Sequence, residues 1–297
     1  MFEGCYVAMV TDFKDGQVNI DGAKALVRKL IADGASGLVP AGCTGEAATL
    51  SARERLDLMK AVMDERGANK AVKVVPGTGT NSTASTIELT KMAEDAGADG
   101  ALIITPYYNK PTQAGLIKHY EAVASKVTLP IILYNVPGRT GVNMLPETVA
   151  EIAKIGNIVA VKEASGSLDQ VSRIASLSDI EILSGDDSLT LPMLAVGARG
   201  VVSVAANLVA GTLSTMVRLF RDGKLRDARE IHLRLLPLFQ ALFIETNPGP
   251  VKAALEMLGR GTGELRLPLV PVAEPTRRKV RQVLQDLDLL ADRSVID

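Results

Sequence analysis

Lys162 stands at the end of a short apolar run, Ile158–Lys162, and a loop-like Glu-Ala-Ser-Gly sequence follows it. Moving an ammonium group out of water costs free energy, so burial disfavours the charged form of lysine and lowers its pKa. A solvated lysine has a pKa of about 10.4, so lowering this value to roughly 7 would give a free amine that acts as a nucleophile at neutral pH. Such an amine forms Schiff bases with carbonyl substrates. Taken alone, Lys162 fits a structural, ion-paired lysine equally well.

Groups that could assist such an amine occur at three other places. The turn Gly42–Glu46 contains Thr44, whose hydroxyl and neighbouring N–H groups suit a carboxylate. Phenols occur within Thr105–Asn109 and at Tyr134, and a phenol near an amine can carry protons as a general acid and base. Arg139 offers a bidentate fork to a carboxylate. Each group also has a structural interpretation: a turn that caps the next helix, packed aromatic residues, and a surface ion pair.

The elements that would position these groups repeat along the chain. Short runs rich in β-branched and small residues occur eight times, with helical periodicity between them. One helical segment, Ser51–Glu65, opens on a capping box at Ser51 and Glu54. Eight βα units spaced by about thirty residues predict an α/β fold, a parallel (β/α)8 TIM barrel, with a doubly wound open sheet as the alternative. The predicted strands are Val7–Val10, Gly37–Ala41, Val72–Pro76, Ala101–Ile104, Ile131–Tyr134, Ile158–Lys162, Ile182–Ser184 and Val201–Val204.

The chain beyond residue 223 has a different pattern. From there onward no convincing strand occurs, and three stretches punctuated by proline are helical in pattern. These stretches are Leu225–Glu245, Pro250–Leu258 and Pro275–Leu290. We therefore predict a catalytic barrel domain over residues 1–223 and a C-terminal helical domain over residues 224–297.

A barrel of this kind carries its active site at the carboxyl ends of the strands. Side chains alternate between the two faces of a strand, so Ala160 and Lys162 share a face, and the small Ala160 leaves room in the interior. The same alternation puts Ile132 and Tyr134 together on the neighbouring strand. We therefore expect the phenol of Tyr134 to lie beside the amine of Lys162.

Composition narrows the class of partner. An apolar fraction of 47% with 3% aromatic residues predicts an aliphatic globular core, and a net charge of −1 provides no basic field for nucleic acid. No apolar run is long enough to span a membrane and the first residues do not resemble a secretory signal, so we expect a cytoplasmic protein with a small-molecule substrate. Cys5 and Cys43 are expected to be reduced. His119 and His232 lack companions at ligand spacing, so we expect no metal site.

Four motifs, GCTGE, TPYYN, YNVPGRTG and VKEASG, occur in this order at the ends of the second, fourth, fifth and sixth predicted strands. Together they closely resemble the dihydrodipicolinate synthase family, also called 4-hydroxy-tetrahydrodipicolinate synthase, of the class I pyruvate-aldolase superfamily. The resemblance covers nearly the whole chain and includes Ser184–Asp187, Gly200–Ser203 and Asn247–Lys252.

The resemblance implies a reaction. Lys162 would form a Schiff base with pyruvate, and the resulting enamine would attack the aldehyde of L-aspartate 4-semialdehyde, a step that opens the lysine and diaminopimelate branch of amino-acid biosynthesis. Tyr134 matches the tyrosine that relays protons, and Thr44 matches the residue that binds the pyruvate carboxylate. Arg139 matches the residue that binds the semialdehyde carboxylate. No metal or organic cofactor is implied, because the iminium itself is the electron sink.

The resemblance also implies an assembly. Gly185 and Val202 match positions whose backbone carbonyls lie near the lysine, and Tyr108 matches a tyrosine that crosses a dimer interface to complete the neighbour's proton relay. The active unit would then be at least a homodimer. Members of the family are usually tetramers, dimers of dimers that assemble partly through the C-terminal helices.

Cys43 departs from the family pattern, which usually has threonine at this position, with a hydroxyl that bridges the two tyrosines. A thiol is a weaker donor and acceptor than a hydroxyl, although the two side chains are close in size. We expect a looser proton relay in which Cys43 takes part without being a nucleophile, because neither histidine has an evident route to activate it.

Two alternatives to this function share some of the same residues. One is another lysine-dependent pyruvate aldolase, such as N-acetylneuraminate lyase or a 2-keto-3-deoxy sugar acid aldolase, which usually lacks the arginine found here as Arg139. The other is a non-catalytic ligand sensor on the same barrel. A sensor has no need of a nucleophile and a proton relay at once, so Lys162 and Tyr134 together disfavour it.

A second departure concerns regulation. Lysine-inhibited family members carry histidines and a glutamate in an allosteric cleft where this chain has Ala52, Arg55 and Ser85, although Asn81 and Tyr107 are kept. Loss of the acid removes a charge-assisted contact to an incoming ammonium group. We predict weak or absent inhibition when turnover is measured against lysine concentration. Half-inhibition below about 1 mM lysine would contradict this prediction.

Overall fold

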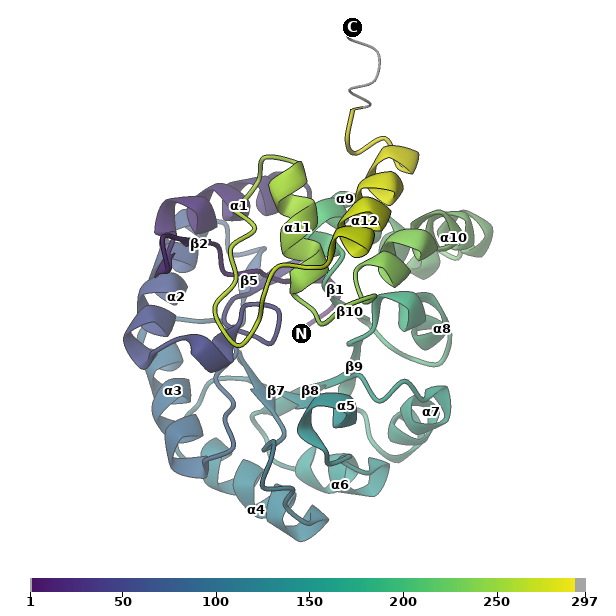
Figure 1. Ribbon diagram of the computed structural model, residues 1–297. Coiled ribbons are helices and arrows are strands. Elements are labelled where there is room, and N and C mark those ends of the chain that lie inside the picture. The colour runs from purple at the N-terminus through teal and green to yellow at the C-terminus, as the bar shows by residue number, and fades with distance from the viewer. Residues whose placement is uncertain (1, 292–297) are drawn as a thin grey trace, which may run out of the picture.

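The computed structural model describes residues 2–291 of the 297-residue chain. Eight parallel strands curl into a barrel, and Figure 1 shows the helices in a ring around them. This architecture confirms the predicted (β/α)8 barrel over the open-sheet alternative. The strands are β1 (Gly4–Ala8), β4 (Gly37–Val39), β5 (Lys73–Val74), β6 (Ala101–Ile104), β7 (Ile131–Asn135), β8 (Ile158–Glu163), β9 (Glu181–Ser184) and β10 (Gly200–Ser203).

Backbone hydrogen bonds close the sheet. Its order is β5-β4-β1-β10-β9-β8-β7-β6, so β5 and β6 are the two strands that must meet. Leu102 donates its N–H to Pro76 O over 2.9 Å and accepts the N–H of Thr78 over 3.0 Å, and Gly77 pairs with Leu102 in parallel. Closure leaves no free sheet edge, and it brings the carboxyl ends of all eight strands to one mouth.

The eight predicted strands all exist, although some of their ends differ. The second and third are shorter than predicted because Pro40 and Pro76 have no N–H to continue the ladder. A small hairpin of β2 (Phe13–Lys14) and β3 (Gln17–Val18) was not predicted. It turns on an Asp-Gly pair, both with positive φ, which is a common hairpin signal.

The four helical segments given bounds from the sequence are all helices; their starts agree within one residue, and two of them end four residues earlier than predicted, at Ala241 and Asp286. The capping box is confirmed: Ser51 Oγ accepts the N–H of Glu54 over 3.2 Å, and Glu54 Oε2 accepts the N–H of Ser51 over 2.9 Å. The helices are α1 (Ile20–Ala32), α2 (Ala52–Arg66), α3 (Thr83–Asp95), α4 (Gln113–Ala124), α5 (Pro137–Thr140), α6 (Pro146–Ile152), α7 (Leu168–Leu177), α8 (Thr190–Ala195), α9 (Ala206–Arg221), α10 (Leu225–Ala241), α11 (Gly249–Met257) and α12 (Glu274–Asp286), with short 3-10 helices η1 (Ala47–Thr49) and η2 (Asp187–Leu189).

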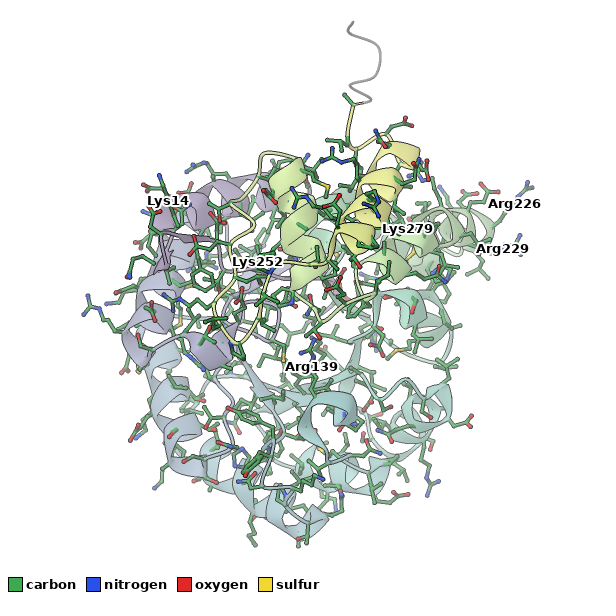
Figure 2. The ribbon with its side chains drawn as sticks, in the orientation of Figure 1. Lys14, Arg139, Arg226, Arg229, Lys252 and Lys279 are labelled. Carbon is green, nitrogen blue, oxygen red and sulfur yellow. The ribbon has the colours of Figure 1, made fainter. Side chains whose placement is uncertain are left out.

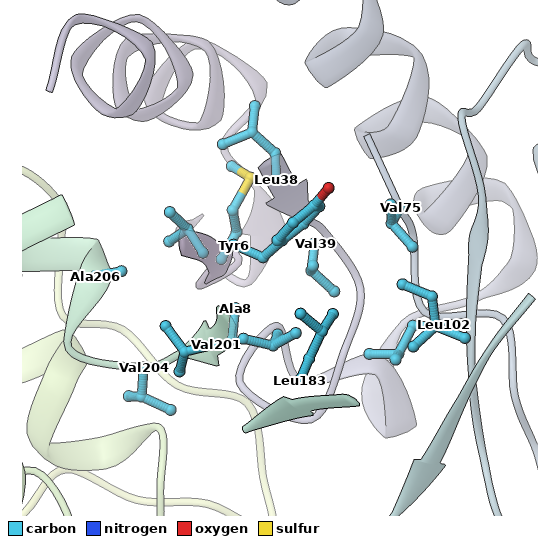
Figure 3. Close-up of a cluster of buried hydrophobic side chains, with 14 of the residues drawn as sticks. Tyr6, Ala8, Leu38, Val39, Val75, Leu102, Leu183, Val201, Val204 and Ala206 are labelled. Carbon is cyan, nitrogen blue, oxygen red and sulfur yellow. The ribbon is translucent and has the colours of Figure 1, made fainter. Parts of the chain in front are cut away.

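The core is aliphatic, as the composition predicts. Figure 3 shows side chains from several strands gathered in one buried cluster, among them Val39, Leu102, Leu183 and Val201. These side chains come from β4, β6, β9 and β10, so the cluster ties together strands that are far apart in the sequence. Buried apolar surface contributes roughly 25 cal/mol per Å² to stability. The strands therefore form a rigid base for the groups at their ends.

The C-terminal helices lie against one side of the barrel. α10 packs on α9, and Figure 1 shows α11 and the chain that joins it to α12 in front of the strands. The predicted boundary at Gly223 falls in the turn between α9 and α10, and we retain residues 1–223 and 224–297 as the proposed division. Residues 292–297 of this second region lie outside the described residues. Among residues 2–291, no helix is both long and apolar enough to cross a membrane.

Candidate active site

Lys162 and Tyr134 lie side by side at the barrel mouth. They are directly paired in the register of β7 and β8, and Lys162 Nζ lies 4.0 Å from the centroid of the Tyr134 ring. Both side chains are buried, with only 6% of each exposed. The strand alternation that placed the phenol next to the amine is therefore confirmed.

The backbone around Lys162 leaves room for its long side chain. Ala160, two residues earlier on the same face of β8, is fully buried and small. Gly185 follows β9, and a Cβ at this position would lie 2.6 Å from Ala164 Cβ and 3.1 Å from Lys162 Cε. A side chain at residue 185 would therefore clash with Ala164 and press against the lysine. Gly185 thus lies against the Lys162 side chain, and the predicted role of its carbonyl stays a prediction.

Burial sets the charge state of this lysine. It lowers the pKa of Lys162 to about 8, against the opposing attraction of Cys43, Asp186 and Asp187. Burial also raises the pKa of both aspartates. Among the described residues no carboxylate forms an ion pair with Lys162, whereas Lys252 Nζ lies 2.6 Å from a Glu46 oxygen. Lys162 is therefore the buried lysine whose amine is available.

The phenol of Tyr134 has a partner in the turn after β4. Burial raises the pKa of Tyr134 well above its ordinary value, and the neighbouring thiol of Cys43 raises it further. Cys43 is partly buried and lines the same cavity as Tyr134. The phenol consequently stays protonated at neutral pH, with a thiol beside it that can accept or return a proton.

Thr44 and Arg139 are linked by a residue that the sequence did not single out. Thr44 is buried, and its Oγ1 accepts a hydrogen bond from Asn247 Nδ2 over 3.0 Å. Arg139, on α5, donates from Nη2 to Asn247 O over 3.2 Å. Figure 2 shows Arg139 near the centre of the ring of helices. Asn247 begins the stretch Asn247–Lys252 that carries part of the family resemblance, but the sequence does not indicate its hydrogen bonds to Thr44 and Arg139.

A cavity of about 300 Å³ adjoins these groups. Lys162 and Thr44 do not line it themselves, but Tyr134, the strand partner of Lys162, and Cys43, the neighbour of Thr44, do. Cys43, Tyr134, Arg139 and Asn247 all contribute to its wall, and Tyr107 lies on the wall as well. Arg139 also lines a wider outer opening, so its guanidinium stands where a ligand would enter. The cavity has the size of a small-molecule site and carries a cation and a phenol beside the buried amine.

Two predicted residues lie apart from this cluster. Tyr108 is 89% exposed and has a φ of 73°, so within one chain its phenol is remote from a buried site. Val202 is buried in β10. The strand register aligns Lys162 with Leu183 and Gly200, which puts Val202 two residues further toward the carboxyl ends. The roles of both residues stay predictions.

The arrangement suits carbonyl chemistry on a small acid. A buried amine with a lowered pKa can attack a ketone, a protonated phenol can exchange the protons of carbinolamine formation, and Thr44 and Arg139 can each bind a carboxylate. Within residues 2–291, no three His, Cys, Asp or Glu side chains are grouped in a way that could hold a metal ion.

Comparisons with known proteins agree with this chemistry. A model of the dihydrodipicolinate synthetase family matches residues 1–287. The 4-hydroxy-tetrahydrodipicolinate synthase of Geobacter metallireducens is 49% identical and covers 98% of this chain and 100% of its own, and that of Methanothrix thermoacetophila is 52% identical and covers 98% and 99%. The solved dihydrodipicolinate synthase of Thermotoga maritima is 44% identical, covers 98% of this chain and 100% of its own, and superposes with a TM-score of 0.95. This chain belongs to the dihydrodipicolinate synthetase family.

Proposed function

We propose that this chain is a 4-hydroxy-tetrahydrodipicolinate synthase, a lyase that condenses pyruvate with L-aspartate 4-semialdehyde through a Schiff base on Lys162. The observation that carries this proposal is the buried amine of Lys162 against the ring of Tyr134, without an ion-pair partner among residues 2–291. Arg139 supports the semialdehyde over the sugar-derived substrates of related aldolases, because its fork at the cavity entrance suits a second carboxylate.

The first half of the reaction builds the enamine. Thr44 and the N–H groups of its turn bind the pyruvate carboxylate, and the free amine of Lys162 attacks the ketone carbon to give a carbinolamine. Tyr134 gives a proton to the departing hydroxyl, which leaves as water, and an iminium forms. The Tyr134 phenolate then takes a methyl proton of the pyruvate unit, which gives the enamine and restores the phenol. Cys43, whose thiol acts on the pKa of Tyr134 from the wall of the same cavity, takes part in this proton relay.

The second half joins the substrates and frees the lysine. Arg139 binds the semialdehyde carboxylate, and the enamine carbon attacks the aldehyde while Tyr134 protonates the new alkoxide. The amino group of the semialdehyde then attacks the iminium carbon and closes the ring. The bond to Lys162 Nζ breaks, and the lysine leaves as an amine. Every proton moves among Lys162, Tyr134, Cys43 and water.

We propose that the active form is a homotetramer in which a second chain supplies Tyr108 to the Tyr134–Cys43 pair. The high exposure of Tyr108 supports this assignment, because a phenol left outside its own chain is free to enter a neighbour. A solved relative that is 43% identical is a monomeric dihydrodipicolinate synthase variant.

Reductive trapping tests the proposed function. Incubation with pyruvate and borohydride should add a reduced pyruvate adduct to Lys162, located by mass spectrometry of peptides. The Lys162→Ala variant is the control, and Lys252, the other buried lysine, should stay unmodified. The protein should then consume L-aspartate 4-semialdehyde in preference to sugar-derived aldehydes. An unmodified Lys162 would exclude the enzymatic proposal, and preference for a sugar aldehyde would favour the alternative aldolases.

The pH dependence of iminium formation follows from the pKa of Lys162. The uncharged amine is the nucleophile, and its fraction grows as pH rises through the pKa, so the trapping rate with cyanoborohydride should rise from pH 6 and level off above a midpoint near 8. A midpoint near 10 would mean that the amine is solvated. In the Tyr134→Phe variant the maximal rate should fall by about 10²-fold or more, because the proton donor is lost.

Replacement of Cys43 tests its place in the relay. Cys43→Thr should preserve or raise turnover, because a hydroxyl is a better donor and acceptor than a thiol of similar size. Cys43→Ala, which removes the partner of Tyr134, should lower kcat. Steady-state kinetics of both variants measure the effect. Complete loss of activity in Cys43→Thr would show instead that the thiol itself is required.

A further inference from the structure

Lys252 and Glu46 form an ion pair that is buried beside the active site. Lys252, on α11, places Nζ 2.6 Å from Glu46 Oε1, and the two side chains are only 2% and 0% exposed. Figure 2 labels Lys252 beside α11, above Arg139. The two residues are 206 positions apart in the chain. The pair therefore joins the C-terminal region to the turn that carries Cys43 and Thr44.

The remaining polar atoms of this pair are also satisfied. Lys252 Nζ donates to Thr11 O over 2.8 Å and lies 4.3 Å from the centroid of the Phe13 ring. Glu46 Oε2 accepts the N–H of Arg266 over 3.1 Å. One carboxylate thus holds two separate C-terminal segments. A buried pair pays a large desolvation cost, and such full coordination is what offsets it.

Glu46 lies in the turn that carries Cys43 and Thr44, and its backbone conformation indicates what the ion pair does there. Glu46 adopts a left-handed conformation with a φ of 52°, which is costly for a residue with a side chain and persists only where the surroundings hold it. It also contributes to the wall of the 300 Å³ cavity, three residues after Cys43. The contacts of its carboxylate are therefore placed to fix the path of the turn.

A second contact from the same segment reaches the turn. Asn247, five residues before Lys252, donates to Thr44 Oγ1 and accepts from Arg139. By contrast, Lys162 and Tyr134 are held by the paired strands β8 and β7 and need no support from the turn. Loosening the turn would therefore move Cys43 and Thr44 and leave the amine and the phenol in place.

We propose that Glu46 and Lys252 are positioning residues, and that their ion pair holds Thr44 and Cys43 in the orientation that binds the pyruvate carboxylate and meets the Tyr134 phenol. This inference rests on the proposed function. A buried pair adds little stability over an apolar pair of similar volume, so placement at the turn accounts better for it than stability does. Misplacement by about 1 Å can cost about 10²-fold in rate.

The test compares this pair with a second ion pair far from the mouth, in which the arginine is buried and the aspartate is 17% exposed. Arg66 Nη1 lies 2.9 Å from Asp99 Oδ2, and the Arg66 side chain is 1% exposed. Asp99 also accepts the N–H of Val74 and lies two residues before β6 begins, at the amino ends of the strands. Glu46→Gln is the test variant and Asp99→Asn the matched control. Glu46→Gln leaves the Lys252 ammonium group buried without its partner, and the double variant Glu46→Gln/Lys252→Met removes this charge. If the single variant does not fold, the double variant is used in its place.

Kinetics, trapping and thermal unfolding are measured on all variants and on the unmodified protein. Glu46→Gln and the double variant should raise the KM for pyruvate at least about tenfold and lower kcat by a smaller factor, while the pH midpoint of iminium formation stays near 8. Asp99→Asn should lower the unfolding temperature and leave KM within about twofold, because it does not touch the turn.

Two outcomes would overturn the inference alone. One is an adduct at Lys162 in the unmodified protein with an unchanged pyruvate KM in both Glu46 variants. The other is an equal rise of KM in Asp99→Asn, which would make the effect one of general stability. Absence of the adduct in the unmodified protein would instead overturn the proposed function, and the positioning role with it.

Discussion

The burial of one amine is the constraint on which the rest of the site depends. A pKa of about 8 for Lys162, against an ordinary value of 10.5, corresponds to about 3 kcal/mol disfavouring the charged form. That cost has to be met by the fold. The closed barrel meets it, because the strands on either side of β8 are fixed by their own ladders and by an aliphatic core. Chemistry at Lys162 is thus supported by packing that never touches a substrate.

The chain contains two buried lysines beside its cavity, and the fold treats them in opposite ways. Lys252 is fully coordinated by Glu46, a carbonyl and a ring face, so its charge is held in place. Lys162 has the ring of Tyr134 but no ion pair among the described residues. Because its charge is compensated, Lys252 stays in one place and can hold its neighbours. Because its charge is not compensated, Lys162 loses its proton readily and can react.

The sequence predicted what depends on local periodicity. The alternation of β7 and β8 was enough to bring Tyr134 to Lys162, and the capping box marked the start of α2. The Asp-Gly turn of the small hairpin was a readable signal that was overlooked. The contact between Asn247 and Thr44 spans 203 positions, and no periodic pattern encodes such a distance. Contacts of this kind follow from the packing of whole elements and emerge only with the tertiary structure.

The same long-range contacts cross the proposed boundary at residue 223 and join the two regions at one site. Thr44 and Arg139 belong to the barrel, but the atoms that link them come from Asn247, in the C-terminal region. The division therefore separates two stretches of chain without separating the site. The barrel strands hold the amine and the phenol, which act on the reacting carbon, and the C-terminal region fixes the residues proposed to bind the carboxylates. Bond chemistry and substrate orientation are thus supported by different parts of one chain, which meet at the Gly42–Glu46 turn.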